Sequence, residues 1–183
     1  MTEENHIEGA SYQEQILESA RRNNTELLLQ IKSELGNDQI KLSELINNTN
    51  ELITNNTPLH IACNLGNWEF IDIVLDIEGV EIDPQNRNLE TPLHLVVKYT
   101  LNEPDHGYFI IDNLLDAGSD PRIKDKDGLK PINYVNRDNE KLIQLLESAE
   151  YAISMEQNQK DQLREFEEQE EKDDGSASES ESD

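Results

Sequence analysis

A tetrapeptide that occurs twice sets the strongest limit on how this chain can fold. Thr-Pro-Leu-His begins at Thr57 and again at Thr91, and a degenerate copy, Lys-Pro-Ile-Asn, begins at Lys130. The starts are 34 and 39 residues apart, much longer than an ordinary helix or strand. Self-similarity on this scale is typical of stacked repeats, in which each unit buries its apolar face against the next.

Each copy carries the local signals of a pair of short helices. Thr57 and Thr91 are N-cap candidates, because a threonine hydroxyl can accept a hydrogen bond from a free N–H group of the first turn. Pro58 and Pro92 then occupy the first helical position, where a missing N–H group costs nothing. In the first copy Gly66 and Asn67 break the first helix, and the apolar residues of 68–75 recur at helical spacing in a second one.

This pattern resembles the ankyrin repeat. Residues 57–83 and 91–120 match the family pattern position by position, residues 130–146 match it in part, and residues 16–31 fit its pair of helices. The resemblance implies an all-α fold, an ankyrin-repeat solenoid of about four helix-turn-helix units with short hairpin fingers. The expected divisions are a disordered N-terminus at 1–11, a repeat domain at 12–155 with units at about 12–52, 53–86, 87–125 and 126–150, and a frayed helix and disordered acidic tail at 156–183.

The chain departs from the family pattern in three places. Residues 32–55 form a longer connection than the family needs, in which Lys-Leu-Ser-Glu-Leu-Ile indicates a short helix and the Asn-rich residues after it indicate an exposed loop. Leu89 stands where the family prefers glycine at a finger tip, so we expect a distorted finger or a left-handed conformation at Asn88. The third unit inserts about six residues, which predicts a loop at 100–107 that is either a functional site or the result of neutral drift.

His60 and His94 occupy equivalent positions in successive units and could be metal ligands or structural groups. Zinc usually takes three or four ligands, and the sequence offers neither a cysteine pair nor a His-x-x-x-His spacing near them. The family resemblance implies instead that each imidazole hydrogen-bonds to backbone between neighbouring units. Asn133, at the third equivalent position, can make similar hydrogen bonds but is a poor metal ligand. We therefore predict no metal site and assign structural roles to the repeat residues Thr57, Pro58, His60, Thr91, Pro92 and His94.

The sequence carries no catalytic pattern. It contains no glycine-rich phosphate loop, no Gly-x-Ser-x-Gly motif and no EF-hand spacing. Its single cysteine, Cys63, lies in an apolar helical stretch, where a buried and inert thiol is expected. The chain is therefore predicted to have no enzymatic activity and to bind no cofactor.

The chain is strongly acidic, with a formal net charge of −25. Twelve acidic and three basic residues lie from Glu156 onward, so most of the negative charge belongs to the part expected to fold. Such a charge repels nucleic acids and anionic membranes and accelerates association with basic proteins. It therefore predicts no nucleic-acid or membrane partner, and it serves either a basic protein partner or solubility alone.

Two features of the sequence bear on its location. The first 15 residues are acidic and lack the apolar core of a signal peptide. No apolar run approaches the ~20 residues that a membrane span needs. We expect a monomer in the cytoplasm, or in both the cytoplasm and the nucleus.

The family resemblance also implies where a partner would bind. In ankyrin stacks a concave surface is lined by the finger tips and by the exposed side of the first helix of each unit. Carried onto this sequence, that surface comprises Asn64, Leu65, Arg87, Asn88, Glu90, Lys98, Tyr99, Lys126, Leu129 and Arg137. Any of them could instead be an ordinary solvent-exposed residue. Tyr99 is expected to contribute most, because aromatic residues are enriched at binding hot spots.

Three serines near the C-terminus, Ser176, Ser178 and Ser180, each have an acidic residue three positions later. This spacing resembles the site of an acid-directed kinase such as casein kinase 2. Phosphorylation is therefore a candidate modification, and it would add a charge of about −1.5 to −2 at each site.

Together these features predict a non-enzymatic protein–protein interaction module. A small ankyrin stack with an acidic tail is similar in architecture to the fungal ankyrin-repeat chaperone of a small-subunit ribosomal protein, which suggests an escort for a basic partner such as a ribosomal protein. The alternative is an adaptor or regulatory subunit that binds an enzyme or a peptide through the concave face. Fold resemblance does not decide between the two.

Overall fold

The computed structural model describes residues 9–174, with side chains through residue 169. In chain order the elements are α1 (Tyr12–Arg22), α2 (Thr25–Glu34), α3 (Gln39–Asn47), α4 (Pro58–Leu65), α5 (Trp68–Leu75), α6 (Pro92–Tyr99), α7 (Pro104–Asp116), the short 3₁₀ helix η1 (Pro131–Tyr134) and α8 (Glu140–Asp174). Residues 9–174 contain no strand, so the predicted all-α class is confirmed.

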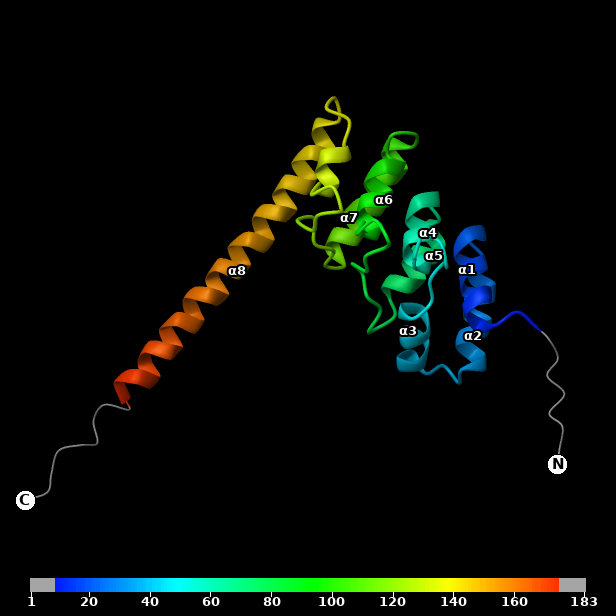
Figure 1. Ribbon diagram of the computed structural model, residues 1–183, viewed down its shortest axis with the longest axis horizontal. Helices are drawn as coiled ribbons and strands as arrows, with labels where there is room; N and C mark the ends of the chain where they lie inside the picture. The colour runs from blue at the N-terminus through cyan, green and yellow to red at the C-terminus, as the bar shows by residue number, and fades with distance from the viewer. Residues whose placement is uncertain (1–8, 175–183) are drawn as a thin grey trace, which may run out of the picture.

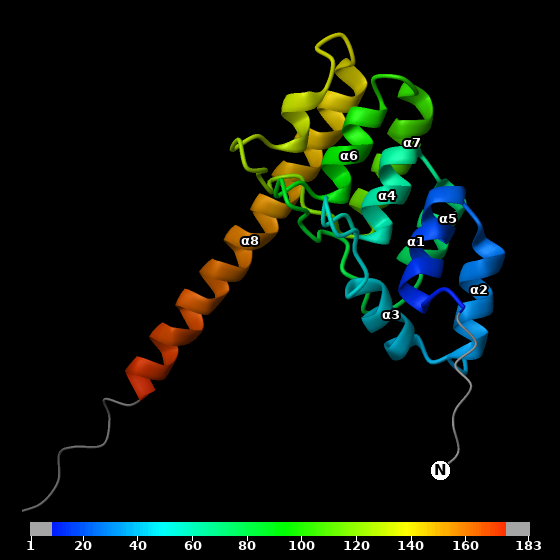
Figure 2. The same ribbon diagram turned by 45° about the vertical axis from the view of Figure 1, so that its right-hand side comes forward.

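The helices pair into stacked units. Figures 1 and 2 show α1 beside α2, α4 beside α5 and α6 beside α7, with η1 and the long α8 at the end of the stack. The inner row consists of α1, α4, α6 and η1, which contact one another in that order. The outer row consists of α2, α5, α7 and the start of α8 (Figure 1). This arrangement is the predicted ankyrin solenoid.

One apolar core runs along the stack. It begins at Ile16 on α1 and ends at Leu146 on α8, and Phe70 on α5 is fully buried near its middle. Each helix pair is covered by its neighbours, so the units are stable only together. The stack thereby holds the inner helices and the fingers in a fixed row.

Left-handed residues end the first two inner helices. Gly66 ends α4 with a φ of 69°, and Asn23 takes the glycine's place at the end of α1 with a φ of 52°. Asparagine tolerates this region because its short side chain can hydrogen-bond locally. The Asn23 side-chain oxygen also accepts a hydrogen bond from the backbone N–H of Phe70 (2.9 Å), which joins the first unit to the second.

The long connection after the first unit contains the predicted short helix, α3. Asp38 caps its start and accepts hydrogen bonds from two backbone N–H groups of the first turn, both at 3.1 Å. Leu42 and Ile46 are buried in the core and hold α3 against α1. The Asn-rich residues that follow, up to Thr57, are mostly exposed.

The finger tip at Leu89 differs from the expectation. Leu89 itself adopts the left-handed conformation, with a φ of 58°, so the prediction of Asn88 in this role was wrong. The Asn86 side-chain oxygen accepts hydrogen bonds from the backbone N–H groups of Asn88 (2.9 Å) and Glu90 (3.0 Å), and these bonds hold the turn. In the next finger Asp125 accepts from Asp127 and Leu129 in the same way, and Gly128 takes the left-handed position.

The insertion in the third unit is largely helical, so the predicted loop at 100–107 was wrong in extent. Only residues 100–103 connect the helices, because α7 begins at Pro104. Proline at the first helical position explains this start. Gly107 is buried against Thr100, and His106 donates from Nε2 to the Gly66 carbonyl (2.8 Å) of the preceding unit. The insertion therefore strengthens contact between units.

The last helix is much longer than expected. Fraying was predicted beyond Gln157, whereas α8 continues through Asp174. Glutamate, glutamine, lysine, arginine and leucine dominate this stretch, all good helix formers, and neither glycine nor proline interrupts them. Its outer half extends away from the stack (Figures 1 and 2). None of the helices described in residues 9–174 is both long and apolar enough to cross a membrane.

Candidate protein interface

The repeat histidines lie inside the stack. His60 is fully buried, and its Nδ1 accepts hydrogen bonds from the Thr57 backbone N–H (3.1 Å) and hydroxyl (2.9 Å). Its Nε2 therefore carries the proton and donates to the Glu90 carbonyl (2.8 Å) of the next unit. Burial lowers the pKa of His60 to about 4, so the ring is neutral near pH 7.

The same bonding recurs along the stack. His94 accepts from the Thr91 N–H (3.1 Å) and donates to the Leu129 carbonyl (3.1 Å), and burial also lowers the pKa of His94. In the last unit Asn133 accepts from the Lys130 N–H (2.8 Å) through its side-chain oxygen. Within residues 9–174, no cluster of three or more potential ligands could hold a metal ion. The histidines tie one unit to the next, as the family resemblance implies.

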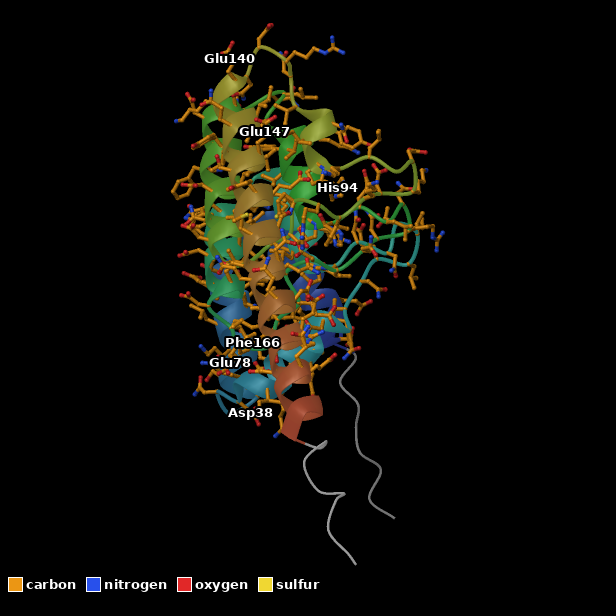
Figure 3. All side chains as sticks on the ribbon, turned by 90° about the vertical axis from the view of Figure 1, so that its left-hand side faces the viewer. Asp38, Glu78, His94, Glu140, Glu147 and Phe166 are labelled. Carbon is orange, nitrogen blue, oxygen red and sulfur yellow. The ribbon has the colours of Figure 1, made fainter. Side chains whose placement is uncertain are left out.

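The fingers are linked by backbone hydrogen bonds into one surface. The Arg87 N–H donates to the Thr54 carbonyl, and the Lys126 N–H donates to the Asn88 carbonyl, both at 2.9 Å. The Lys126 ammonium also donates to the Asn88 side chain (2.9 Å). Figure 3 shows the fingers together on one side of the helices, with His94 near their base. A partner would therefore meet a continuous row rather than three separate loops.

Two adjoining hollows form a groove beside the first two fingers. The smaller, of about 250 Å³, is polar and is lined chiefly by Asn56, Asn64, Asn86, Arg87 and Asn88. The larger, of about 1060 Å³, lies between α1 and the loop at 50–54. Ile53 and Thr54 line both hollows, so the groove runs without interruption from α1 to the second finger.

The larger hollow has an apolar floor that the sequence did not indicate. Leu17 on α1 lies opposite Leu52 and Ile53, which are 93% and 79% exposed. The only signal was a pair of apolar residues inside an otherwise polar, Asn-rich loop. Their pairing with α1 depends on the fold, because more than thirty residues separate Leu17 from Leu52.

The rim of this hollow is acidic. Glu14, Glu18 and Glu51 lie around it together with one base, Arg21. Arg21 donates to Glu51 (2.8 Å) and also lies 3.7 Å from Glu18. The hydrogen bond from Arg21 holds the pKa of Glu51 below its ordinary value, so this carboxylate stays ionised. Glu18 also forms an ion pair with Arg22, so three carboxylates face two guanidinium groups and the rim keeps a small negative surplus.

Two of the expected contact residues serve internal bonding. Glu90 is only 8% exposed, but it still lines the smaller hollow, so it stays a predicted contact residue. It forms an ion pair with Lys98 and accepts from the Asn86 amide (3.1 Å). Burial raises the pKa of Glu90, but these bonds outweigh it and hold the pKa below its ordinary value. Lys98 also lies 4.1 Å from the centre of the Tyr134 ring, so its charge is satisfied within the stack.

Tyr99 does not line the groove, contrary to the expectation that it would lead the contact with a partner. Its half-buried ring covers Gly66, where any added Cβ would collide with it. It also meets the His106 ring edge to face, with 5.9 Å between centroids. Tyr99 therefore packs one unit against the next.

The other expected residues divide into two groups. Asn64, Arg87 and Asn88 line the polar part of the groove. Leu65, Lys126, Leu129 and Arg137 are exposed but lie outside both hollows. Ser176, Ser178 and Ser180, the candidate phosphorylation sites, fall outside the residues that the structure describes.

Comparison with known proteins agrees with this architecture. Residues 54–83 match the family model of the ankyrin repeat. A protein of Saccharomyces cerevisiae, ankyrin repeat-containing protein YGL242C, is 47% identical over 149 residues, which cover 80% of this chain and 82% of the yeast protein. Ankyrin repeats mediate protein–protein interactions, and proteins built from them are generally binding modules without enzymatic activity. The chain belongs to the ankyrin-repeat family.

Proposed function

We propose that the groove binds a basic protein and that the chain escorts this partner by covering its charged surface. The observation that carries the proposal is an apolar floor at Leu17, Leu52 and Ile53 inside an acidic rim. Large apolar side chains left in the open on a rigid scaffold mark interaction sites, because their burial by a partner is favourable.

The polar end of the groove suits the main chain of an extended segment. Asn64 and Asn88 offer both donors and acceptors there, and a peptide backbone needs both. An apolar side chain of the same segment would enter the larger hollow next to Ile53. The fingers are held by their own hydrogen bonds, so little ordering is required when a partner binds.

The chain's charge supports a basic partner. A net charge of −25 attracts cationic proteins and accelerates their encounter, and salt weakens this attraction. Proteins that bind nucleic acids are basic and expose that charge before assembly, so an escort with an acidic surface would suit them. The proposed escort acts as a monomer in the cytoplasm, the nucleus or both. The second candidate, an adaptor for an enzyme or a peptide, requires the groove but not the charge.

Affinity purification of the tagged full-length chain tests the proposal. The double variant Leu52→Gln/Ile53→Gln removes the apolar floor, and Ile40→Gln, an equally exposed apolar residue on α3, is the matched control. We expect one basic protein to co-purify with the wild type and with Ile40→Gln, to be lost from the double variant, and to dissociate as salt rises to ~0.5 M.

Other outcomes would decide against parts of the proposal. A neutral partner that stays bound at ~0.5 M salt would favour the adaptor function. Retention of the partner by the double variant would exclude the groove as its binding site.

A further inference from the structure

Beyond the groove, α8 carries a second unpartnered surface, which runs from Tyr151 toward the outer end of the helix. Its exposed apolar side chains, each 41% to 68% accessible, are Tyr151, Met155, Leu163 and Phe166. At 3.6 residues per turn they fall within about a third of the helix circumference and form one stripe. We refer to them as the α8 stripe, and Phe166 is labelled in Figure 3.

Most of the α8 stripe lies on the side opposite the docked face. α8 is held to the stack by the buried Leu142 and Leu146, by an ion pair of Glu150 with Lys130, and by a hydrogen bond from Arg122 to Gln157 (3.1 Å). Helical periodicity sets Tyr151, Met155 and Phe166 away from the two leucines, whereas Leu163 lies at the edge of the docked face, in line with Leu145 but about five turns farther from the stack. Its apolar side chains therefore cannot reach the stack.

The continuation of the docked face is also unsuited to the stack. Lys160 and Arg164 follow Leu142 and Leu146 on that side, and both are exposed. Because these side chains are charged, this part of α8 has no apolar surface that packing against the repeats would bury. Consistent with this, the outer half of α8 stands away from the units in Figures 1 and 2.

The charge around the α8 stripe selects the occupant. Residues 156–174 contain nine acidic and three basic side chains. A second copy of the chain would bring two such surfaces together, and an anionic membrane would oppose the same charge. A partner with lysine or arginine beside its apolar residues could pack those residues on the stripe and also pair its charges with the carboxylates of α8.

We infer that the α8 stripe docks a basic amphipathic helix of a partner protein. Apolar residues at helical spacing on a straight helix pack best against another helix, whose side chains fill the spaces between them. The flanking carboxylates of α8 then pair with the basic residues beside the partner's apolar stripe. This surface is separate from the groove and shares with the proposed function only the basic character of the partner.

The test is a titration of the full-length chain into a fluorescein-labelled peptide of 18 residues, with leucine on one helical face and lysine elsewhere. A scrambled peptide of the same composition, with no apolar face, controls for charge. The variant Leu163→Gln/Phe166→Gln removes the centre of the α8 stripe without changing charge. Ile40→Gln, on α3 and outside both surfaces, is the matched control and should bind like the wild type, whereas Leu52→Gln/Ile53→Gln tests whether the peptide enters the groove.

We expect the wild type and the groove variant to bind the amphipathic peptide at least about tenfold more tightly than the scrambled one. The α8 variant should bind the amphipathic peptide about tenfold more weakly than the wild type does. Circular dichroism should show a gain of peptide helicity only when the stripe is intact. Equal affinity for both peptides, or undiminished binding by the α8 variant, would overturn the inference. Loss of binding in the groove variant would assign the peptide to the groove. A wild-type dimer that the α8 variant dissociates in sedimentation velocity would make a second copy the occupant. The groove proposal is tested separately, by the co-purification of its partner with the wild type and with Leu52→Gln/Ile53→Gln.

Discussion

The central repeats and the outer half of α8 use their side chains in opposite ways. In the repeats, His60 and His94 are buried, and among the described residues every buried side-chain polar atom has a hydrogen-bond partner. In α8, every residue from 155 to 169 is exposed. The contrast indicates that stability is concentrated in the stack, whereas the outer half of α8 contributes a surface whose loss the fold would tolerate.

Replacing a stack histidine should have the largest effect. His60→Ala leaves the Thr57 N–H without its ring acceptor, removes one of the two hydrogen bonds to the Glu90 carbonyl and opens a cavity, which should lower the free energy of unfolding by about 3 kcal/mol. Urea unfolding followed by circular dichroism measures the loss. His60→Asn should lose less, because an amide oxygen can still accept from Thr57 as Asn133 does from Lys130. A loss below about 1 kcal/mol for His60→Ala would refute the proposed tie between units.

Acid should weaken the stack through the same residue. The folded pKa of His60 is about 4, below the ~6.5 of an unfolded histidine, so only the unfolded chain gains a proton between these values. The His60 contribution is therefore complete above about pH 6.5 and is lost as the pH falls toward 4. Between pH 7 and 5 the wild type should lose about 2 kcal/mol more than His60→Asn in urea unfolding. Parallel pH profiles of the two proteins would contradict this expectation.

A substitution at the finger tip should raise the free energy of unfolding instead of lowering it. Leu89→Gly removes a side chain from a left-handed residue with a φ of 58° and should stabilise the chain by about 1 kcal/mol. Gly128→Ala, at the equivalent position of the next finger, should destabilise by a similar amount because its φ is 76°. Thermal unfolding of both variants gives the comparison. Destabilisation by Leu89→Gly would mean that the leucine side chain makes a compensating contact.

The smallest effect should come from α8. Phe166→Ala removes an exposed ring from a helix face that contacts no other element, so stability should change by less than about 0.5 kcal/mol. Urea unfolding beside His60→Ala provides the direct comparison. A loss above about 1 kcal/mol would show that the outer half of α8 contributes to the fold.

The sequence predicted the elements whose cause is local. Thr57 and Pro58 mark the start of α4 through capping and the missing N–H, and the same signals recur at Thr91. The glycine expected to end the first helix, Gly66, does so in the left-handed conformation, with a φ of 69°. Such signals act within a few residues, so they could be recognised without knowing what the helices contact.

Two expected site residues make internal contacts that depend on how the chain folds, close to its own finger for Glu90 and between units for Tyr99. Glu90 is buried because Lys98 and Asn86 reach it, and Tyr99 is turned toward Gly66 of the preceding unit. The spacing of residues along the chain does not predict these contacts. The floor at Leu52 was missed for the same reason, because it becomes part of a groove only when α1 lies opposite.

The asparagine at 133 has a consequence for how this array could lengthen. His60 and His94 each use one ring nitrogen on their own unit and the other on the unit that follows. The side-chain oxygen of Asn133 accepts a hydrogen bond from the Lys130 N–H of its own unit, and an asparagine side chain is shorter than that of histidine. A duplicated unit appended at this end would lack the side-chain hydrogen bond that each histidine makes to the following unit. A unit added at the C-terminal end would therefore depend on finger bonds and core packing alone, whereas one duplicated between internal units would keep the histidine bond.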